Sequence, residues 1–388
     1  METSTLKRLR VIAPGRINLL GEHLDYNHGI VLPAAIDRFV EFDFNETHRP
    51  TVLIEALDLN EQWEFLWSEL NDSFTTGWKT YVKGVFLLMG FDSHAPSGLH
   101  IRFKSNIPIG AGLSSSAALC CGLAYGLNEI YALGKSRMEL ALLAQQTEHQ
   151  FAGVKCGLMD QVASLFGQAN HLLAFDCISH DITPFELPLQ GAQLFLIDSK
   201  VKHNLASSAY NERRASLEEA WGLARASFPH LETWRDLNAA EFEQLSFQLV
   251  ATTQKRLSYV VEEIARVRAV QNLAKEMALL APGQHSEVFL AQLGTYLNQT
   301  HVGLQAQYEV SCEEIDFLQE AICAQKGVLG ARMMGGGFGG CLLVLAKASF
   351  FFDRALPTLF AAYEKRYGLA AESIKVKLNN GVSSVYLT

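Results

Sequence analysis

The sequence lacks the features of a disulfide-built, exported or membrane-spanning protein. Its seven cysteines form an odd set with no C-x-x-C pair, a pattern that favours a reducing compartment. The first ten residues are polar and basic and lack the apolar core of a secretory signal. The most apolar stretch, residues 341–352, is interrupted by Lys347 and is well short of the ~20 residues that span a bilayer. We therefore expect a soluble cytoplasmic protein.

An excess of positive charge is also missing. The chain has 32 basic and 41 acidic residues, a net charge of −9, so it has no general attraction to phosphate polymers or anionic membranes. We expect no nucleic-acid or membrane partner. What the chain does have is length and apolar content: 388 residues, 49% of them hydrophobic, can fill more than one core.

Low-complexity tracts and internal repeats are absent, so the domain organisation has to come from local patterns. Strand patterns separated by turn residues dominate the first part of the chain; they cover residues 10–12, 30–33, 39–45, 52–57 and 99–104. Helical patterns prevail from residue 211, with a long helix over 256–280. Strands are expected again at residues 341–346, 374–378 and 382–386. Because the composition changes near residue 187, we predict an α/β (α+β) protein with domains 1–186 and 187–388.

The segment 108–118, PIGAGLSSSAA, joins a predicted strand to a predicted buried helix over 114–133. Gly110 and Gly112 let the backbone approach a ligand, and the amides at a helix start favour a phosphate. The hydroxyls of the three serines that follow can reach phosphate oxygens or a hard divalent ion. A turn that only caps the helix is the structural alternative.

A second helix is expected from Ser136, which forms a capping box with Glu139, to about Gln150. Glu148 lies near the end of this helix, and Asp160 is expected in the loop that follows. Both carboxylates can therefore approach one cleft.

Two common nucleotide-binding motifs do not fit. No Lys-Ser or Lys-Thr follows Gly110 as a Walker A loop requires, and the Gly134-Lys-Ser tripeptide has Glu129 where the first glycine belongs. Residues 335–340 contain a formal G-x-G-x-x-G, but a predicted helix precedes them and a predicted strand follows, the reverse of the dinucleotide-binding order. The chain is predicted to be neither a P-loop NTPase nor a Rossmann protein.

A third segment, residues 15–27, reads GRINLLGEHLDYN and packs charged side chains between predicted strands. Alone it could be a solvated loop with a local ion pair. Together with 108–118 and 335–340, in this order, it resembles the three motifs of the GHMP small-molecule kinase superfamily, and most closely the galactokinase family. Segments 150–161 and 201–214 are also similar, so that the resemblance runs from about residue 11 to residue 345.

The resemblance implies a two-domain GHMP kinase fold, with an N-terminal domain like ribosomal protein S5 domain 2 and a C-terminal α+β domain. It implies that a sugar, ATP and Mg²⁺ bind in the cleft between the domains. We expect a monomer. The residues that match the family's functional positions are Asp160 and Arg16 for catalysis; Glu22, His23, Asp25, Gly157 and Tyr210 for the sugar; Gly110, Ala111, Gly112, Leu113, Ser114, Ser115, Ser116, Gly336 and Gly337 for the nucleotide; and Ser116 and Glu148 for the metal.

The implied reaction is transfer of the γ-phosphoryl group of ATP to the anomeric 1-hydroxyl of galactose. Asp160 is expected to be ionised beside Arg16 and to remove the hydroxyl proton, while Arg16 stabilises developing negative charge. The alternative is that Asp160 only positions the hydroxyl, since a loose transition state has little need for early proton removal.

Two motif positions depart from the family pattern, because Leu24 and Met334 stand where galactokinases usually have threonine. Each replaces a hydroxyl near the expected site, which leaves the sugar specificity open. The rival hypotheses are a kinase for arabinose, N-acetylgalactosamine or galacturonate, and a non-catalytic galactose and ATP sensor. Residues 335–338, GGGF, resemble the galactokinase form of the third motif, and the Ser116-Ala117 pair that sensors lack is present.

Overall fold

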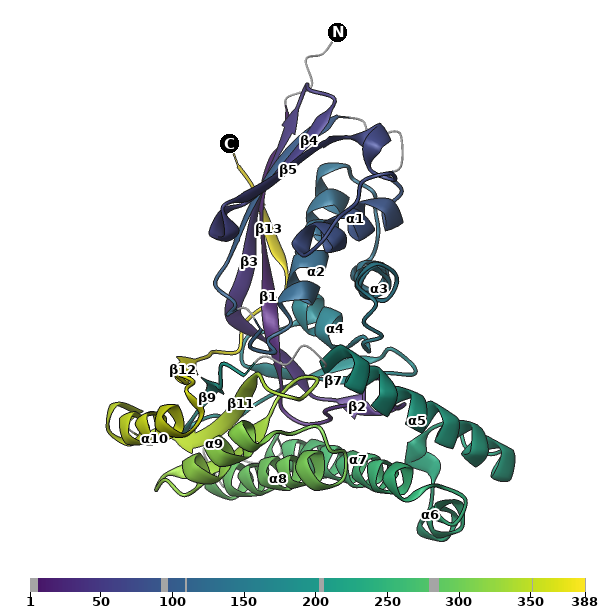
Figure 1. The fold of residues 1–388 in the computed structure, drawn as a ribbon, viewed down its shortest axis with the longest axis vertical. Coiled ribbons are helices and arrows are strands. Elements are labelled where there is room, and N and C mark those ends of the chain that lie inside the picture. The colour runs from purple at the N-terminus through teal and green to yellow at the C-terminus, as the bar shows by residue number, and fades with distance from the viewer. Residues whose placement is uncertain are drawn as a thin grey trace.

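The computed structural model describes residues 6–91, 97–108, 110–201, 206–278, 286–350 and 352–387. The molecule is elongated, with a helix-covered sheet at one end and a second, helix-rich part at the other (Figure 1). Among the described residues, no helix combines the length and the apolar character needed to cross a membrane.

The N-terminal part is built on a six-stranded sheet in the order β13-β1-β3-β6-β4-β5. Its strands are β1 (Arg8–Asn18), β3 (Pro33–Thr47), β4 (Thr51–Ala56), β5 (Glu61–Leu66), β6 (Gly98–Ser105) and β13 (Ser383–Tyr386). Buried and more exposed positions alternate along much of β3 and along β4, because successive side chains of a strand point to opposite faces. One face is therefore apolar and needs a cover.

Four helices cover that face (Figure 1). They are α1 (Trp78–Leu88), α2 (Ser115–Ile130), α3 (Arg137–Thr147) and α4 (Met159–Phe166). The central helix, α2, is buried along most of its length, and Gly122 and Gly126 leave room for the rings of Phe42 and Phe44. A Cβ at either glycine would collide with a ring, so these glycines permit close helix–sheet packing.

The second part contains a four-stranded antiparallel sheet in the order β10-β11-β9-β12. Its strands are β9 (Ala192–Asp198), β10 (Val328–Met333), β11 (Cys341–Lys347) and β12 (Glu372–Lys375). The helices of this part are α5 (Ala206–Ser227), α6 (Ala239–Ser246), α7 (Ala251–Ala278), α8 (Ser286–Ala306), α9 (Glu313–Cys323) and α10 (Phe352–Tyr367). A small sheet of β2 (Ile30–Val31), β7 (His171–Asp176) and β8 (Ile182–Glu186) lies near α5 and α7 (Figure 1).

The predicted capping box is confirmed. Ser136 caps α3, accepting the backbone N–H of Glu139 while the Glu139 carboxylate accepts that of Ser136. The helix ends at Thr147, and Glu148 begins a short π-helical turn, Glu148–Ala152.

Two placements are wrong. Residues 15–18 were expected between strands, yet they belong to β1, since the pairing with β3 continues past an irregularity between Pro14 and Arg16. Asp160 was expected in a loop, yet it lies in the first turn of α4, where a carboxylate is favoured by the helix dipole.

The predicted C-terminal strand exists as β13, but it pairs with β1 in the N-terminal sheet. The last part of the chain thus returns to the first part of the fold. The boundary between residues 186 and 187 stays a prediction.

Candidate active site

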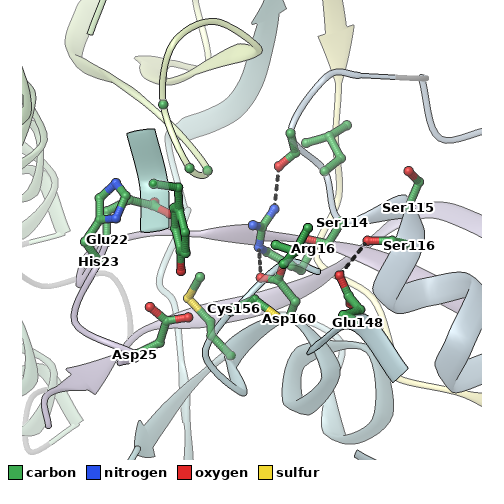
Figure 2. A pocket seen from close by; sticks show the side chains of 18 of the residues that line it. Arg16, Glu22, His23, Asp25, Ser114, Ser115, Ser116, Glu148, Cys156 and Asp160 are labelled. Atoms are coloured by element: carbon green, nitrogen blue, oxygen red, sulfur yellow. Dashed lines mark hydrogen bonds and ion pairs between the residues drawn. The ribbon is translucent and has the colours of Figure 1, made fainter. Parts of the chain in front are cut away.

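The three motifs meet around one pocket of about 370 Å³. Every residue predicted for catalysis, sugar, nucleotide or metal lines it except Ala111 and Gly157. In Figure 2, Glu22, His23 and Asp25 lie on one side, the serines of the glycine loop and Glu148 on the other, and Asp160 with Arg16 between them. The lining residues run from Arg16 to Gly337, so the pocket is lined by segments far apart in the sequence.

Asp160 is held by two donors at the centre of the pocket. Its Oδ1 accepts a hydrogen bond from Arg16 Nε at 2.7 Å, and its Oδ2 accepts one from Ser114 Oγ at 2.6 Å. Arg16 Nη1 also donates to the carbonyl of Gly112 at 2.5 Å. The Asp160 side chain remains 23% exposed while that of Arg16 is 5% exposed, so the carboxylate is fixed but accessible from the pocket.

The glycine loop turns through left-handed backbone at Gly110, Gly112 and Ser114, with φ of +78°, +72° and +59°. Glycine adopts this conformation without strain, and the turn delivers the chain to the start of α2. Gly335 of the third motif lies against the same loop, since a Cβ there would be 3.4 Å from the Gly112 carbonyl oxygen. The second and third motifs thus form one continuous glycine-rich wall.

Glu148 and Ser116 form the far end of this wall. Ser116 Oγ donates to Glu148 Oε2 at 3.1 Å, and Gln161 Nε2 donates to Glu148 Oε1 at 2.9 Å. Burial, followed by the nearby charge of Asp160, raises the pKa of Glu148 to about 7. Glu148 is thus a buried carboxylate beside a hydroxyl and near another carboxylate. A hard cation bound there would offset the repulsion between the two negative charges.

No group of three or more His, Cys, Asp or Glu side chains in the described ranges is arranged to hold a metal ion. The pair Ser116 and Glu148 nevertheless fits the chemistry of Mg²⁺, which prefers oxygen ligands. In nucleotide sites this ion is typically bound by one or two carboxylates together with phosphates and water.

The opposite wall is formed by residues 19–29, which we call the sugar loop after the role that the sequence resemblance implies. His23 is nearly fully buried and stacks between tyrosines, with ring centroids 4.7 Å from Tyr308 and 5.6 Å from Tyr210. Burial and the positive charges of Arg332 and Arg213 lower the pKa of His23 to about 3. At neutral pH it is a neutral imidazole.

The two ring nitrogens of His23 differ. Nδ1 lies 2.6 Å from the Tyr26 hydroxyl, whereas Nε2 is buried without a hydrogen-bond partner in the described protein. Because buried polar atoms are normally paired, Nε2 is an atom that a polar ligand in the pocket could satisfy.

The two carboxylates of the sugar loop are held differently. Glu22 Oε2 pairs with Arg332 Nη1 at 2.8 Å, and the residue is 2% exposed. For Asp25, burial, followed by the charges of Asp160 and Glu22, raises the pKa to about 7. Asp25 is therefore an incompletely compensated carboxyl group at the pocket wall.

The two predicted residues that do not line the pocket have supporting positions. Gly157 lies behind Asp25, where a Cβ would collide with the Asp25 carboxylate, so its contribution is space. Ala111 is buried, and its carbonyl packs close to Gly340 of the third motif.

Leu24 and Met334, the two departures from the family pattern, are both fully buried in the hydrophobic core and do not line the pocket. Both positions are near the pocket, since Leu24 stands between His23 and Asp25 and Met334 directly precedes Gly335. Their side chains serve packing.

Sequence reasoning missed four residues that line the pocket, namely Val154, Cys156, Met159 and Gly335. All four lie inside or beside segments that the resemblance covers. Their proximity to a motif could therefore have identified them as pocket residues. It also missed Arg332, which stands just before the third motif. Nothing in the sequence around Arg332 indicates that its side chain is buried.

Comparison with known proteins gives a consistent result over the whole chain. Residues 5–42 match the galactokinase galactose-binding signature, residues 80–168 the GHMP kinases N terminal domain and residues 287–355 the GHMP kinases C terminal domain.

The galactokinases of Thermosipho africanus and Thermotoga maritima are each 36% identical to this chain, over 97% of it and 100% of their own length. The crystal structure of Lactococcus lactis galactokinase complexed with galactose superposes with a TM-score of 0.87 at 29% identity, covering 98% of this chain and 95% of that one. The chain therefore belongs to the galactokinase family of the GHMP kinases.

Proposed function

We propose that this protein transfers the terminal phosphoryl group of ATP to the anomeric 1-hydroxyl of galactose, giving galactose 1-phosphate and ADP. The observation that carries the proposal is the position of Asp160 and Arg16 between the sugar loop and the glycine loop (Figure 2). A phosphoryl acceptor and a phosphoryl donor bound on the two sides would meet at this pair. Such placement supplies much of the catalysis in phosphoryl transfer.

In this proposal Asp160 removes the proton of the 1-hydroxyl. Each of its oxygens accepts one hydrogen bond from the protein, and a carboxylate oxygen can accept more than one. Arg16 orients the carboxylate and places a positive charge where the transferring group becomes most negative. The alternative role, orientation of the hydroxyl without proton removal, uses the same geometry and is separated from it by the Asp160 variant described below.

Ser116 and Glu148 are proposed to hold Mg²⁺ with the ATP phosphates. When bound, this ion neutralises charge on the β- and γ-phosphates. The glycine loop and the amino-terminal end of α2 contribute backbone amides and the helix dipole to the same task.

The sugar side is proposed to select galactose through oriented polar groups. Glu22, His23, Asp25 and Tyr210 line this side, and a sugar that fails to pair with such groups leaves them buried and unsatisfied, which discriminates strongly between epimers.

A coupled ADP-release assay with a sugar panel tests the function. We expect turnover with galactose and none with 1-deoxygalactose, which lacks the acceptor hydroxyl, and the product identified by NMR should be galactose 1-phosphate. Faster turnover with arabinose, N-acetylgalactosamine or galacturonate would show that this sugar, and not galactose, is the substrate. Binding of galactose and ATP without any ADP release would instead support a sensor.

We also propose that the enzyme works as a monomer in the cytoplasm. All seven cysteines are free thiols, which is compatible with a reducing compartment.

A further inference from the structure

Two buried ionic side chains that are remote in sequence from the sugar loop contact it from outside the pocket. We propose that Glu263 and Arg332 are positioning residues that fix the sugar loop, and with it the Glu22 carboxylate, for sugar binding. This inference rests on the proposed function, because it assumes that the loop binds the sugar.

Glu263 lies on α7 and is completely buried. Its Oε1 accepts the backbone N–H of Gly21 at 2.6 Å, and its Oε2 accepts from Arg266 Nε at 2.7 Å and Thr300 Oγ1 at 2.6 Å. A buried carboxylate is tolerated only when it is paired and hydrogen-bonded. Here one of its three donors is the backbone of the residue directly before Glu22.

A second contact from α7 reinforces the first. Tyr259 stands four residues before Glu263 and so lies on the same face of the helix. Its hydroxyl donates to the backbone carbonyl of Glu22 at 3.0 Å. Side chains of α7 therefore form hydrogen bonds with the N–H of Gly21 and the carbonyl of Glu22. These two bonds restrict rotation of the backbone on either side of the Glu22 side chain.

Arg332, at the end of β10, holds the other flank of the loop. Its Nε donates to the carbonyl of Leu19 at 2.9 Å, its Nη2 donates to the carbonyl of Asn18, and its Nη1 pairs with Glu22 Oε2 at 2.8 Å. One rigid guanidinium thus ties the end of β1 to the Glu22 carboxylate. Because Gly335 follows three residues later, the same side chain also sets the distance between the sugar loop and the third motif.

Neither residue lines the pocket, and both are completely buried, so any effect on the sugar must pass through the loop. Buried ion pairs are weak contributors to stability compared with apolar packing, and fixing one geometry is their better-attested use. The expected signature is a defect specific to the sugar, with nucleotide binding unchanged.

The first test compares Glu263→Gln with Glu262→Gln. The first variant keeps an oxygen that can accept the Gly21 N–H but loses the charge that binds Arg266, whereas Glu262 is about half exposed on the same helix and also contacts Arg266. We expect the KM for galactose to rise about tenfold in Glu263→Gln, because a charge-assisted hydrogen bond is lost. The KM for ATP should stay within about twofold, and Glu262→Gln should resemble the wild type.

A second pair of variants makes a smaller change, which is less prone to prevent folding. Thr300→Val removes one donor to Glu263, and Thr300→Ser restores a hydroxyl at the same position. We expect a several-fold rise in the galactose KM for the valine variant and recovery for the serine variant. Thermal melting of each variant shows which of them are folded.

Arg332 is tested through its partner. Arg332→Lys keeps the charge but loses the planar group that bonds three backbone carbonyls and a carboxylate. If Arg332 acts through Glu22, its effect on the galactose KM should largely disappear in a Glu22→Gln background, as in a double-mutant cycle for coupled residues.

The outcomes separate the two proposals. If Glu263→Gln and Arg332→Lys raise the KM values for galactose and ATP equally, or change only the melting temperature, the positioning role is wrong and the kinase function stands. If Asp25→Asn, on the pocket wall itself, also leaves the galactose KM unchanged in the same assay, the assignment of the sugar loop fails instead.

Discussion

The two sides of the pocket are built by different means. The sugar loop depends on partners far away in the chain: Gly21 bonds to a residue 242 positions later and Leu19 to one 313 positions later. The turn of the glycine loop comes mainly from local conformation, with three left-handed residues leading into a helix. Its distant partners are Arg16, which donates to the Gly112 carbonyl, and Asp160, which accepts from Ser114. A phosphate is bound by charge and backbone amides that any suitable loop can supply, whereas a sugar is selected by side chains whose positions must be set from outside the loop.

Asp160 joins the two sides, so its change should have the largest effect. Asp160→Asn keeps a hydrogen-bonding group of the same size but cannot take a proton, and we expect kcat to fall by roughly 10²- to 10⁴-fold with both KM values little altered. Asp72→Asn, on an exposed loop, is the control. A kcat within about tenfold of the wild type would show that Asp160 only positions the hydroxyl.

The next largest effect should come from the glycine-loop side alone. Glu148→Gln removes the proposed carboxylate ligand, and we expect kcat/KM for ATP to fall roughly 10²-fold and to recover partly at higher Mg²⁺ concentration. Calorimetry should find galactose binding unchanged, and the exposed Glu64→Gln should have no effect. An unaltered Mg²⁺ dependence in Glu148→Gln would count against the metal assignment.

The sugar side alone should respond to Asp25→Asn, with a rise in the galactose KM of about tenfold and little change for ATP. The same variant tests the raised pKa. Because the pKa of Asp25 is about 7 in the folded protein and 3.8 ordinarily, the ionised group destabilises the fold. This cost is absent below the ordinary pKa, grows as the pH rises, and is complete above about 7.

Melting curves at about pH 5 and about pH 8 check this sign. Asp25→Asn should melt above the wild type at the higher pH, and the difference should shrink at the lower pH. A difference that is equal at both, or larger at the lower pH, would contradict the raised pKa.

The smallest effect on catalysis should follow from restoring the family's threonines. Leu24→Thr and Met334→Thr place a hydroxyl in the hydrophobic core, so we expect each to reduce the free energy of unfolding by roughly 2 kcal/mol or more. The galactose KM of the folded fraction should remain near that of the wild type. A marked change in sugar preference would show that these positions reach the ligand after all.

Much of the site could be predicted from the sequence because the motifs are short and local. The capping box at Ser136 and the glycine turn before α2 each depend on neighbours within a few residues, and local hydrogen bonds and φ preferences decide them. One prediction failed locally, because α4 begins before Asp160. The others failed where pairing between distant segments decided the outcome. Arg16 lies on a strand because β3 pairs with it, and the last strand joins the first sheet.

The sequence by itself determined the family, the three motifs and the residue types that meet phosphate, metal and sugar. Only the tertiary structure decided that Glu22 is held by Arg332, that Glu263 reaches the sugar loop, and that Leu24 and Met334 are core residues. The physical reason is that burial and ion pairing depend on which surfaces pack together, and a one-dimensional pattern carries no record of partners hundreds of residues away.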